Sequence, residues 1–199
     1  YCWKDETPLS NHELRMDDDV YKDRQDPTVT VAFPVLDDGS SALAAELAGV
    51  NVLAWTTTPW TLPTNQALAV GPDVNYAVLP AGENQPGTNT VAAGSRYLLA
   101  ADLVGAHAKD LGYADAAAAQ EAVTATYTGS QLAGLRYAPL WDIFEDDEKW
   151  GTKNAWQIVV DSYITTTDGT GVVHQAPAYG EDDQRVCEAN GIPVVISID

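Results

Sequence analysis

The chain has 199 residues, 45% of them hydrophobic, and a formal net charge of −19. Six tryptophans and nine tyrosines supply large side chains for an interior, so the composition indicates one folded domain and excludes wholesale disorder. No apolar run approaches the roughly 20 residues that a membrane-spanning helix needs, and the start lacks a basic-then-apolar signal segment.

The acidic balance, 29 acids against ten bases, argues against a nucleic-acid-binding surface, because Lys and Arg make most phosphate contacts. Such acids also solubilise a surface. If a chain of this charge acts on a nucleic acid, most of the binding contacts must come from another part of a larger protein. The only cysteines, Cys2 and Cys187, are too few for a disulfide framework or, with three histidines, for a zinc site. We expect two reduced thiols, no metal and a cytoplasmic location.

The first part of the chain predicts an arm, two strands and a helix. Residues 1–27 are polar and interrupted by two prolines, so we expect an extended arm. The alternating β-branched stretch 28–33 predicts a strand, and a serine cap at 40 or 41 predicts a short helix to 47. The mostly apolar stretch 50–55 predicts a second strand, buried on both faces.

The middle of the chain is richer in alanine. Residues 74–79 predict a strand, which a loop containing Gly and Pro follows at 81–90. Two helices are expected near 101–111 and 115–123, the second capped by Asp115.

The last part of the chain returns to strands. A turn-rich connection is expected at 129–139 and an acidic loop at 145–148. Residues 156–164 and 171–175 predict strands, and 182–190 predict a short helix. Strands outnumber helices without βαβ regularity, which favours a mainly β fold with peripheral helices (α+β), its mixed sheet forming a closed or nearly closed barrel.

The first motif that carries chemistry is Trp55–Asn65 (WTTTPWTLPTN). If the strand continues, Thr56 and Thr58 share one face and Thr57 takes the other, and pairing ends at Pro59. Hydroxyls and methyls beside an indole can hold a small branched aliphatic group and offer hydrogen bonds to an ester or a water. The alternative is a β-branched strand that merely leads into a Pro-rich turn.

The second motif is Asp168–Asp183 (DGTGVVHQAPAYGEDD). A glycine turn leads into a short strand that delivers His174, and Pro177 breaks the pairing. Gly180 then opens a helix whose first turn holds three acids. The alternative is structural, since such acids commonly cap a helix or complement its dipole, and a histidine at a strand end is commonly structural too.

The two motifs together resemble the editing domain inserted into isoleucyl-tRNA synthetases. Residues 1–13 (YCWKDETPLSNHE) resemble the junction of that insertion, and 129–140 (GSQLAGLRYAPL) resemble the family's middle motif. The related valyl and leucyl enzymes carry Arg-Pro after two threonines, whereas 58–60 read Thr-Pro-Trp here, which favours the isoleucyl branch. The resemblance implies one editing domain over 1–199 of a larger synthetase, with 1–27 and 190–199 as junction arms, and a barrel of the valyl/isoleucyl/leucyl editing-domain type.

The implied activity is hydrolysis of valine from tRNA(Ile) by a positioned water. A tight second pocket admits valine and excludes isoleucine, because forcing in an extra methylene costs about 1–3 kcal/mol. The implied partners are the valine-carrying 3′ end of tRNA(Ile) and the catalytic core of the parent synthetase, with no membrane and a monomeric fragment. No cofactor is implied. The HIGH and KMSKS signatures are absent, so ATP would be used only by that core, and we expect no tRNA charging by this chain.

The resemblance also assigns site residues. Asp183, nine positions after His174, matches the acid that pairs with the substrate's α-ammonium group, and on that spacing Asp182 is rejected. His174 forms the pocket wall with the face of two threonines and limits its size. The expected catalytic residues are Asp183, Thr57 and His174; the expected substrate-binding residues are Thr56, Thr57, Thr58, Trp60, His174, Asp183 and Asn65.

Within this set, Thr57 and Trp60 are expected to position the ester or the terminal adenosine, and Asn65 is a further candidate on the adenosine side. A Ser-His-Asp mechanism is not favoured, because the sequence has no G-x-S-x-G elbow. Two other functions stay open. One is a module that binds the aminoacyl group without hydrolysis, and the other is a valyl-type editing domain that clears threonine. Hydrolysis of free valyl-adenylate stays open as well.

Overall fold

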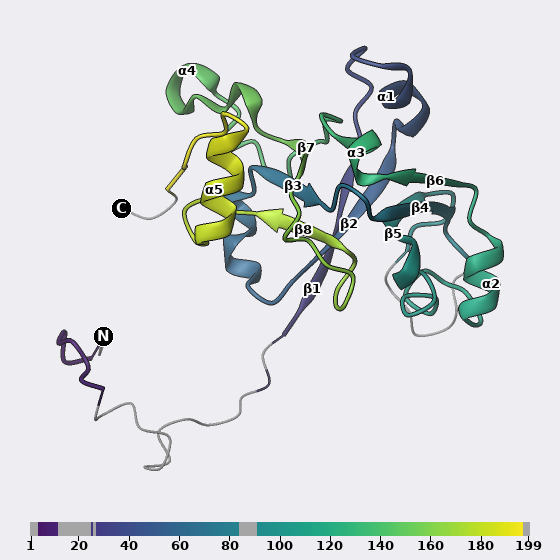
Figure 1. The fold of residues 1–199 in the computed structure, drawn as a ribbon, viewed down its shortest axis with the longest axis horizontal. Helices are drawn as coiled ribbons and strands as arrows, with labels where there is room; N and C mark the ends of the chain where they lie inside the picture. Colours follow the sequence, from purple (N-terminus) through teal and green to yellow (C-terminus); the bar gives the residue numbers. More distant parts are fainter. Residues whose placement is uncertain (1–3, 12–24, 26, 84–90, 197–199) are drawn as a thin grey trace.

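The computed structural model describes residues 4–11, 25, 27–83 and 91–196, and its strands form two open sheets (Figure 1). The strands are β1 (Val29–Pro34), β2 (Val50–Thr56), β3 (Ala67–Val70), β4 (Asn75–Pro80), β5 (Arg96–Ala100), β6 (Ala125–Thr128), β7 (Gln157–Val160) and β8 (Val172–Gln175). The larger sheet has the order β1-β2-β5-β4-β6, and the smaller has the order β7-β3-β8.

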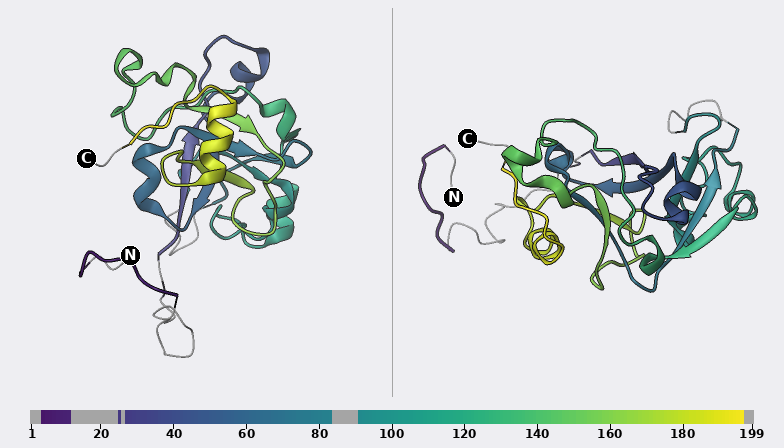
Figure 2. Two further views of the ribbon diagram at one scale, coloured as in Figure 1. Left: turned by 60° about the vertical axis from the view of Figure 1, so that its left-hand side comes forward. Right: turned by 90° about the horizontal axis from the view of Figure 1, so that it is seen from above.

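The helices are short. The α-helices are α1 (Ala42–Leu47), α2 (Ala116–Glu121), α3 (Gly129–Leu132), α4 (Asp147–Trp150) and α5 (Glu181–Ala189), and the 3-10 helices are η2 (Pro59–Thr64), η3 (Ala101–Leu103) and η4 (Thr152–Asn154). Among the helices of the described part of the chain, none is both long and apolar enough to cross a bilayer. Helix α5 lies on the side of the smaller sheet, and α2 lies at the opposite end of the long axis (Figures 1 and 2).

The expectation of a mainly β fold built on a closed or nearly closed barrel is wrong, because the fold is mixed α/β and neither sheet closes. Strand β2 contacts β8 of the other sheet, but no backbone ladder joins the two strands. Strand β2 pairs with β1 along residues 51–56 and with β5 at residues 50–52, whereas β8 pairs with β3. The sheets therefore pack against each other through their side chains, and one core cluster contains Val52 and Leu98 of the larger sheet with Leu68 and Ile158 of the smaller.

Several predicted elements are confirmed, with boundaries shifted by a residue or so. They are the strands β1, β2, β4 and β8 and the helices α1, α2 and α5. The expected caps form, since Ser41 Oγ accepts from the N–H of Ala44 at 3.0 Å, and Asp115 Oδ1 accepts from the N–H of Ala118 at 2.8 Å.

Other predictions of local structure are wrong. The stretch 101–111 holds only η3 and turns, the strand expected to run to residue 164 ends at Val160, and the acidic loop at 145–148 overlaps α4. The turn-rich connection contains α3, and the strands β3, β5 and β6 were not predicted. Strand β3 reads Ala-Leu-Ala-Val and is wholly buried, so it shows neither the alternation nor the β-branched content by which a strand is identified. The loop expected at 81–90 and the arm at 1–27 lie partly outside the described residues.

Candidate active site

A cleft of about 400 Å³ lies where the end of β2 meets the end of β8, with η2 and the first turn of α5 beside it. The residues that line it are Trp55, Thr56, Thr57, Thr58, Trp60, Thr61, Val173, His174, Ala176, Tyr179 and Asp183. The structure thus brings six of the seven sequence-predicted site residues into one cleft. Asn65 is the exception, since it lies behind His174 and is 5% exposed.

The threonine side of the cleft begins where β2 ends. The hydroxyls of Thr56 and Thr58 lie 3.3 Å apart, and Thr56 Oγ1 accepts from the N–H of Thr58 at 3.1 Å. Because the strand stops at Thr56, Thr57 leaves the strict alternation and lines the cleft too. Among the described residues, the hydroxyl of Thr57 has no partner that would compete with a ligand. Trp60, 66% exposed, forms the outer rim.

His174 forms a buried wall of the same cleft. Strand β8 places it opposite Leu68 of β3 in the antiparallel ladder. Its Nε2 lies 2.8 Å from Oγ1 of Thr61, and its Nδ1 lies 3.3 Å from Nδ2 of Asn65. Burial lowers the pKa of His174 to about 4, so the ring is neutral at physiological pH. Both ring nitrogens are engaged with protein groups, which leaves neither to take a proton from a water.

Asp183 supplies the carboxylate of the cleft. Its Oδ2 accepts from the backbone N–H of Ala176 at 2.9 Å, across the bend between β8 and α5. Burial raises the pKa of Asp183, the Ala176 hydrogen bond lowers it, and the charge of Asp182 raises it. Gly180 permits this approach, because a Cβ at that position would lie 3.1–3.3 Å from the carboxylate atoms.

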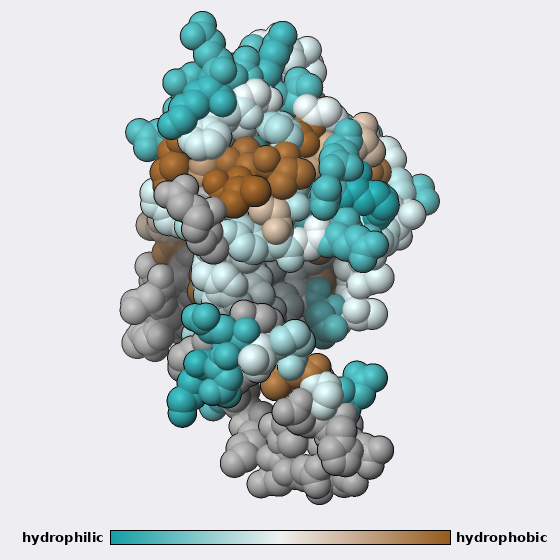
Figure 3. All heavy atoms as spheres, turned by 90° about the vertical axis from the view of Figure 1, so that its left-hand side faces the viewer, coloured by the Kyte–Doolittle hydropathy of each residue, from teal (hydrophilic) through white to brown (hydrophobic). Residues whose placement is uncertain are grey.

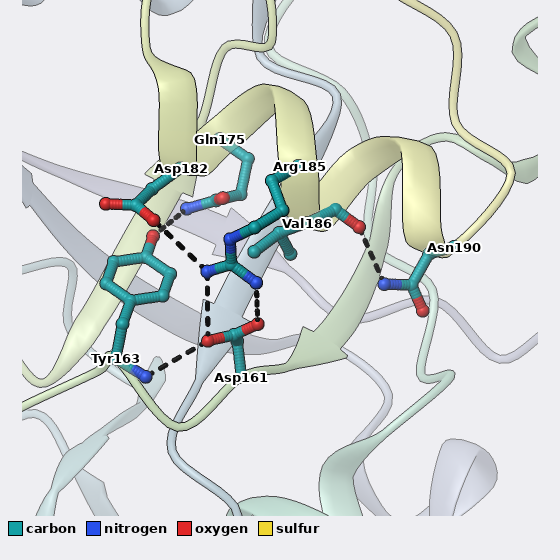
Figure 4. Close-up of polar contacts among 7 residues, drawn as sticks. All are labelled: Asp161, Tyr163, Gln175, Asp182, Arg185, Val186 and Asn190. Atoms are coloured by element: carbon teal, nitrogen blue, oxygen red, sulfur yellow. Dashed lines mark hydrogen bonds and ion pairs between the residues drawn. The ribbon is translucent and has the colours of Figure 1, made fainter.

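A polar network on the outer side of α5 holds this helix in place (Figure 4). Arg185 donates to both carboxylate oxygens of Asp161, at 2.8 and 3.3 Å, and to Asp182 at 3.2 Å. Asp161 also accepts from the N–H of Tyr163, whose hydroxyl accepts from Gln175 at 2.8 Å. Asp182 is therefore bound to Arg185 and does not line the cleft, in contrast to its neighbour Asp183.

The cleft also contains residues that the sequence did not single out. Thr61 belongs to the first motif, and the threonine-rich composition of that motif was the only signal for it. Trp55, Val173, Ala176 and Tyr179 lie in the two motifs as well, but their role depends on a fold that brings two sheets together. Among the described residues, no group of three His, Cys, Asp or Glu side chains is placed to hold a metal ion. Cys187, on the buried face of α5, is a free thiol, whereas Cys2 lies outside the described residues.

The arrangement can bind an amine, a small side chain and an ester. A buried carboxylate attracts an ammonium group, the threonine hydroxyls offer donors and acceptors, and His174 limits one end of the cavity. Figure 3 shows an apolar patch on the side of α5 and the C-terminal segment, where Val194 and Ile196 are exposed.

No family model matches the chain. Over 100% of its length the chain is 64% identical to the isoleucine--tRNA ligase of Leifsonia xyli subsp. xyli (strain CTCB07), of which it covers 18%. It is 48% identical to that of Mycobacterium tuberculosis (strain ATCC 25618 / H37Rv), of which it covers 17%. The chain therefore spans less than a fifth of the length of these relatives.

Two solved structures share the fold. The crystal structure of GlLeuRS-CP1 matches with a TM-score of 0.56 over 84% of this chain and 66% of that chain, at 14% identity. The editing domain of the P. knowlesi cytosolic leucyl-tRNA synthetase matches with a TM-score of 0.58 over 85% of this chain and 70% of that chain, also at 14% identity.

The fold is thus that of aminoacyl-tRNA synthetase editing domains. By sequence, the chain belongs to the isoleucine--tRNA ligase family. The resemblance recognised in the two motifs is confirmed.

Proposed function

We propose that this chain hydrolyses valine esterified to tRNA(Ile) and spares isoleucine. The observation that carries the proposal is the joint placement of Thr56, Thr58, His174 and Asp183 in one cleft. Among the described residues that line it, Asp183 is the only acid, so it is the natural partner of the α-ammonium group. The charged hydrogen bond would fix the amino acid and disfavour substrates without a free amine.

The reaction follows from that anchoring. A water held near the Thr57 hydroxyl attacks the ester carbonyl carbon, and the negative charge that develops on the carbonyl oxygen is stabilised by hydroxyl and backbone N–H donors. Collapse of the intermediate breaks the bond to the ribose oxygen, which takes up the proton that the attacking water loses, and releases valine and free tRNA. His174 acts here as a wall, because its two ring nitrogens are bound to Thr61 and Asn65.

Size selection rests on that wall. Because hydrogen bonds hold the His174 ring on both sides, the ring moves little when a substrate carries an additional methylene. Overpacking of this kind costs about 1–3 kcal/mol of binding free energy. Valine therefore fits and isoleucine does not. Trp60 and Thr57, at the open side of the cleft, are placed to contact the terminal adenosine. Asn65 lies behind His174, and this position supports a role through the His174 ring and not a contact with the adenosine.

The remaining partners belong to the same proposal. We place the chain in the cytoplasm beside the catalytic core of the parent synthetase, as a monomer, with no cofactor, since a positioned water and hydrogen-bond donors are sufficient for ester hydrolysis. The arginines of the described part of the chain are committed to internal acceptors. Arg96 binds the carbonyls of Glu46 and Ala48, and Arg136 binds that of Ala155. Delivery of the tRNA would thus fall to the rest of the protein.

A panel of mischarged tRNAs tests the proposal. We expect Val-tRNA(Ile) to be deacylated, Ile-tRNA(Ile) to be spared, and Thr-tRNA(Val) to be no better a substrate than an unrelated aminoacyl-tRNA. Preferential hydrolysis of Thr-tRNA(Val) would replace the proposal with a valyl-type domain. Binding of Val-tRNA(Ile) without hydrolysis, even with the full-length synthetase, would indicate a binding module.

A further inference from the structure

His174 belongs to a series of hydrogen-bonded side chains that starts in the core, behind the cleft, and ends at Thr61. The hydroxyl of Tyr137 donates to Oδ1 of Asn65 at 2.6 Å. Nδ2 of Asn65 lies 3.0 Å from the carbonyl oxygen of Ala67 and 3.3 Å from Nδ1 of His174. On the other side of the ring, Nε2 lies 2.8 Å from Oγ1 of Thr61. The four residues that make these hydrogen bonds are at most 7% exposed, so water does not compete for the bonds. They are Tyr137, Asn65, His174 and Thr61.

Two backbone carbonyl groups determine which atom donates in each hydrogen bond between Asn65, His174 and Thr61. The carbonyl of Ala67 can only accept, so the nitrogen of the Asn65 amide must face it, and the same nitrogen then donates to Nδ1 of His174. At the other end, Thr61 donates its proton to the carbonyl of Thr58 at 2.8 Å. The Thr61 oxygen therefore accepts from Nε2. The imidazole carries its single proton on Nε2, and a second proton on Nδ1 would meet the N–H of Asn65.

The core holds Asn65 through its backbone as well. Trp156 adopts φ +56°, which non-glycine residues rarely do, and its indole N–H donates to the Asn65 carbonyl at 3.1 Å. The backbone N–H of Tyr137 donates to the carbonyl of Trp156 at 3.0 Å. The ring of Tyr137 packs edge-on against Phe33, with centroids 5.2 Å apart. Burial raises the pKa of Tyr137 well above its ordinary value, so its hydroxyl stays a donor.

We propose that Tyr137 is a positioning residue for the amino-acid pocket, which acts through Asn65 to fix the tautomer and orientation of the His174 ring. The effect on substrate choice rests on the proposed function. The tautomer and orientation of the His174 ring do not depend on the proposed function, and they can be measured separately. Tyr137 does not line the cleft and is 1% exposed, so we expect its influence on selectivity to pass through the hydrogen bonds.

The variant Tyr137→Phe removes one hydroxyl and keeps the ring that packs on Phe33. Oδ1 of Asn65 then loses its buried donor, and the amide is no longer held in the orientation that serves Nδ1 of His174. We expect a mixture of ring tautomers, a looser wall, and a several-fold rise in Ile-tRNA(Ile) deacylation relative to Val-tRNA(Ile). The matched control is Tyr97→Phe, because the Tyr97 hydroxyl accepts from the N–H of Ala92 in a different core cluster.

Nitrogen-15 NMR of the imidazoles reports directly which ring nitrogen of His174 carries the proton. The chain has three histidines, and His174→Gln assigns the signal. We expect a neutral ring protonated on Nε2 in the unmodified chain and in Tyr97→Phe, and a second tautomer with a higher titration midpoint in Tyr137→Phe. Asn65→Asp provides an independent variant, since a carboxylate only accepts and would draw a proton onto Nδ1.

The outcomes separate the two proposals. An Nε2-protonated ring in both Tyr137→Phe and Asn65→Asp, with unchanged discrimination between the two tRNAs, would overturn the role of Tyr137. If the ring responds as expected but no aminoacyl-tRNA is hydrolysed, even by the full-length synthetase, the role of Tyr137 in ordering the ring holds and the proposed function fails.

Discussion

The carboxylate of Asp183 accepts a hydrogen bond from the backbone N–H of Ala176 at 2.9 Å, and this contact ties the first turn of α5 to the end of β8. Both residues line the cleft, so the bond fixes the carboxylate relative to the wall that His174 forms on the same strand. The bond engages Oδ2 of Asp183 and leaves Oδ1 available for an ammonium group.

The variant Asp183→Ala tests the amine anchor. Hydrogen bonds to charged groups contribute about 1.5–3 kcal/mol, so we expect kcat/KM for Val-tRNA(Ile) deacylation to fall by roughly 10- to 100-fold. Single-turnover deacylation measures the loss. Asp182→Ala is the matched control, because Asp182 is exposed and bound to Arg185, and it should change the rate little. Equal rates for both variants would remove the role assigned to Asp183.

The variant His174→Ala tests size selection. Removing the imidazole enlarges the pocket by several heavy atoms, so we expect Ile-tRNA(Ile) to become a substrate and the ratio of Val to Ile deacylation to fall by about tenfold or more. The control is His107→Ala, which removes a histidine that binds the carbonyl of Gly169 and does not line the cleft. An unchanged ratio in His174→Ala would contradict the assignment of the wall.

Gly180→Ala tests the position of the carboxylate without changing its chemistry. The added methyl would lie 3.1–3.3 Å from the Asp183 carboxylate, and the carboxylate would have to shift by a few tenths of an ångström. The φ angle of Gly180 is −147°, so no backbone strain arises. We expect deacylation to slow by about tenfold with the unfolding transition nearly unchanged. Gly105→Ala meets a similarly close neighbour, Ala116, away from the cleft, and should leave the rate intact.

The buried histidine predicts a pH dependence of stability. The pKa of His174 is lowered from 6.5 to about 4 in the folded chain, so the unfolded chain binds more protons between these values. The stabilisation is fully present above pH 6.5 and is lost as the pH falls through this window, by about 2–3 kcal/mol at pH 4.5. Asp183 acts in the opposite sense near its own raised pKa.

Urea unfolding at pH 7.0, 5.5 and 4.5 measures this loss. The comparison is with His174→Gln, which carries every other titrating group and lacks the imidazole. We expect the unmodified chain to lose about 2–3 kcal/mol more than the variant over this range. Parallel pH profiles for the two proteins would show that His174 is not held neutral in the folded state.

The net charge of −19 predicts weak action by the isolated chain. Acids outnumber bases by 29 to ten, and the described arginines bind internal acceptors, so the chain is expected to contact tRNA phosphates weakly. We expect kcat/KM on Val-tRNA(Ile) to lie at least tenfold below that of the full-length synthetase, mainly through KM. Full parental activity from the isolated chain would contradict this expectation.

The sequence predicts the local part of the site well and the long-range part poorly. Thr56, His174 and Asp183 belong to motifs whose composition indicates chemistry, and the structure brings those motifs together. The hydrogen bonds of Thr61 and Tyr137 to His174 and Asn65 join positions 72 or more apart in the chain, and no local pattern announces such pairs.

The barrel was expected from the number of strands, which does not state how they pair. Closure would need a backbone ladder between β2 and β8, but β2 pairs with β1 and with β5, a strand that the sequence did not predict, and β8 pairs with β3. The missed strands share a cause. Strands β3 and β5 are almost entirely buried on both faces, so they lack the alternation that marks a half-exposed strand.

The two sides of the cleft belong to different sheets, since the threonines lie at and just after the end of β2 and His174 lies on β8, with no backbone ladder between the two strands. The width of the cleft is therefore set by how the interior side chains space one sheet from the other. An enlarged residue at Leu68 or Val52, out of reach of any substrate, would change which amino acid the cleft accepts while every lining residue stayed the same. Selectivity in this fold is encoded as much in the interior as in the surface that meets the ligand.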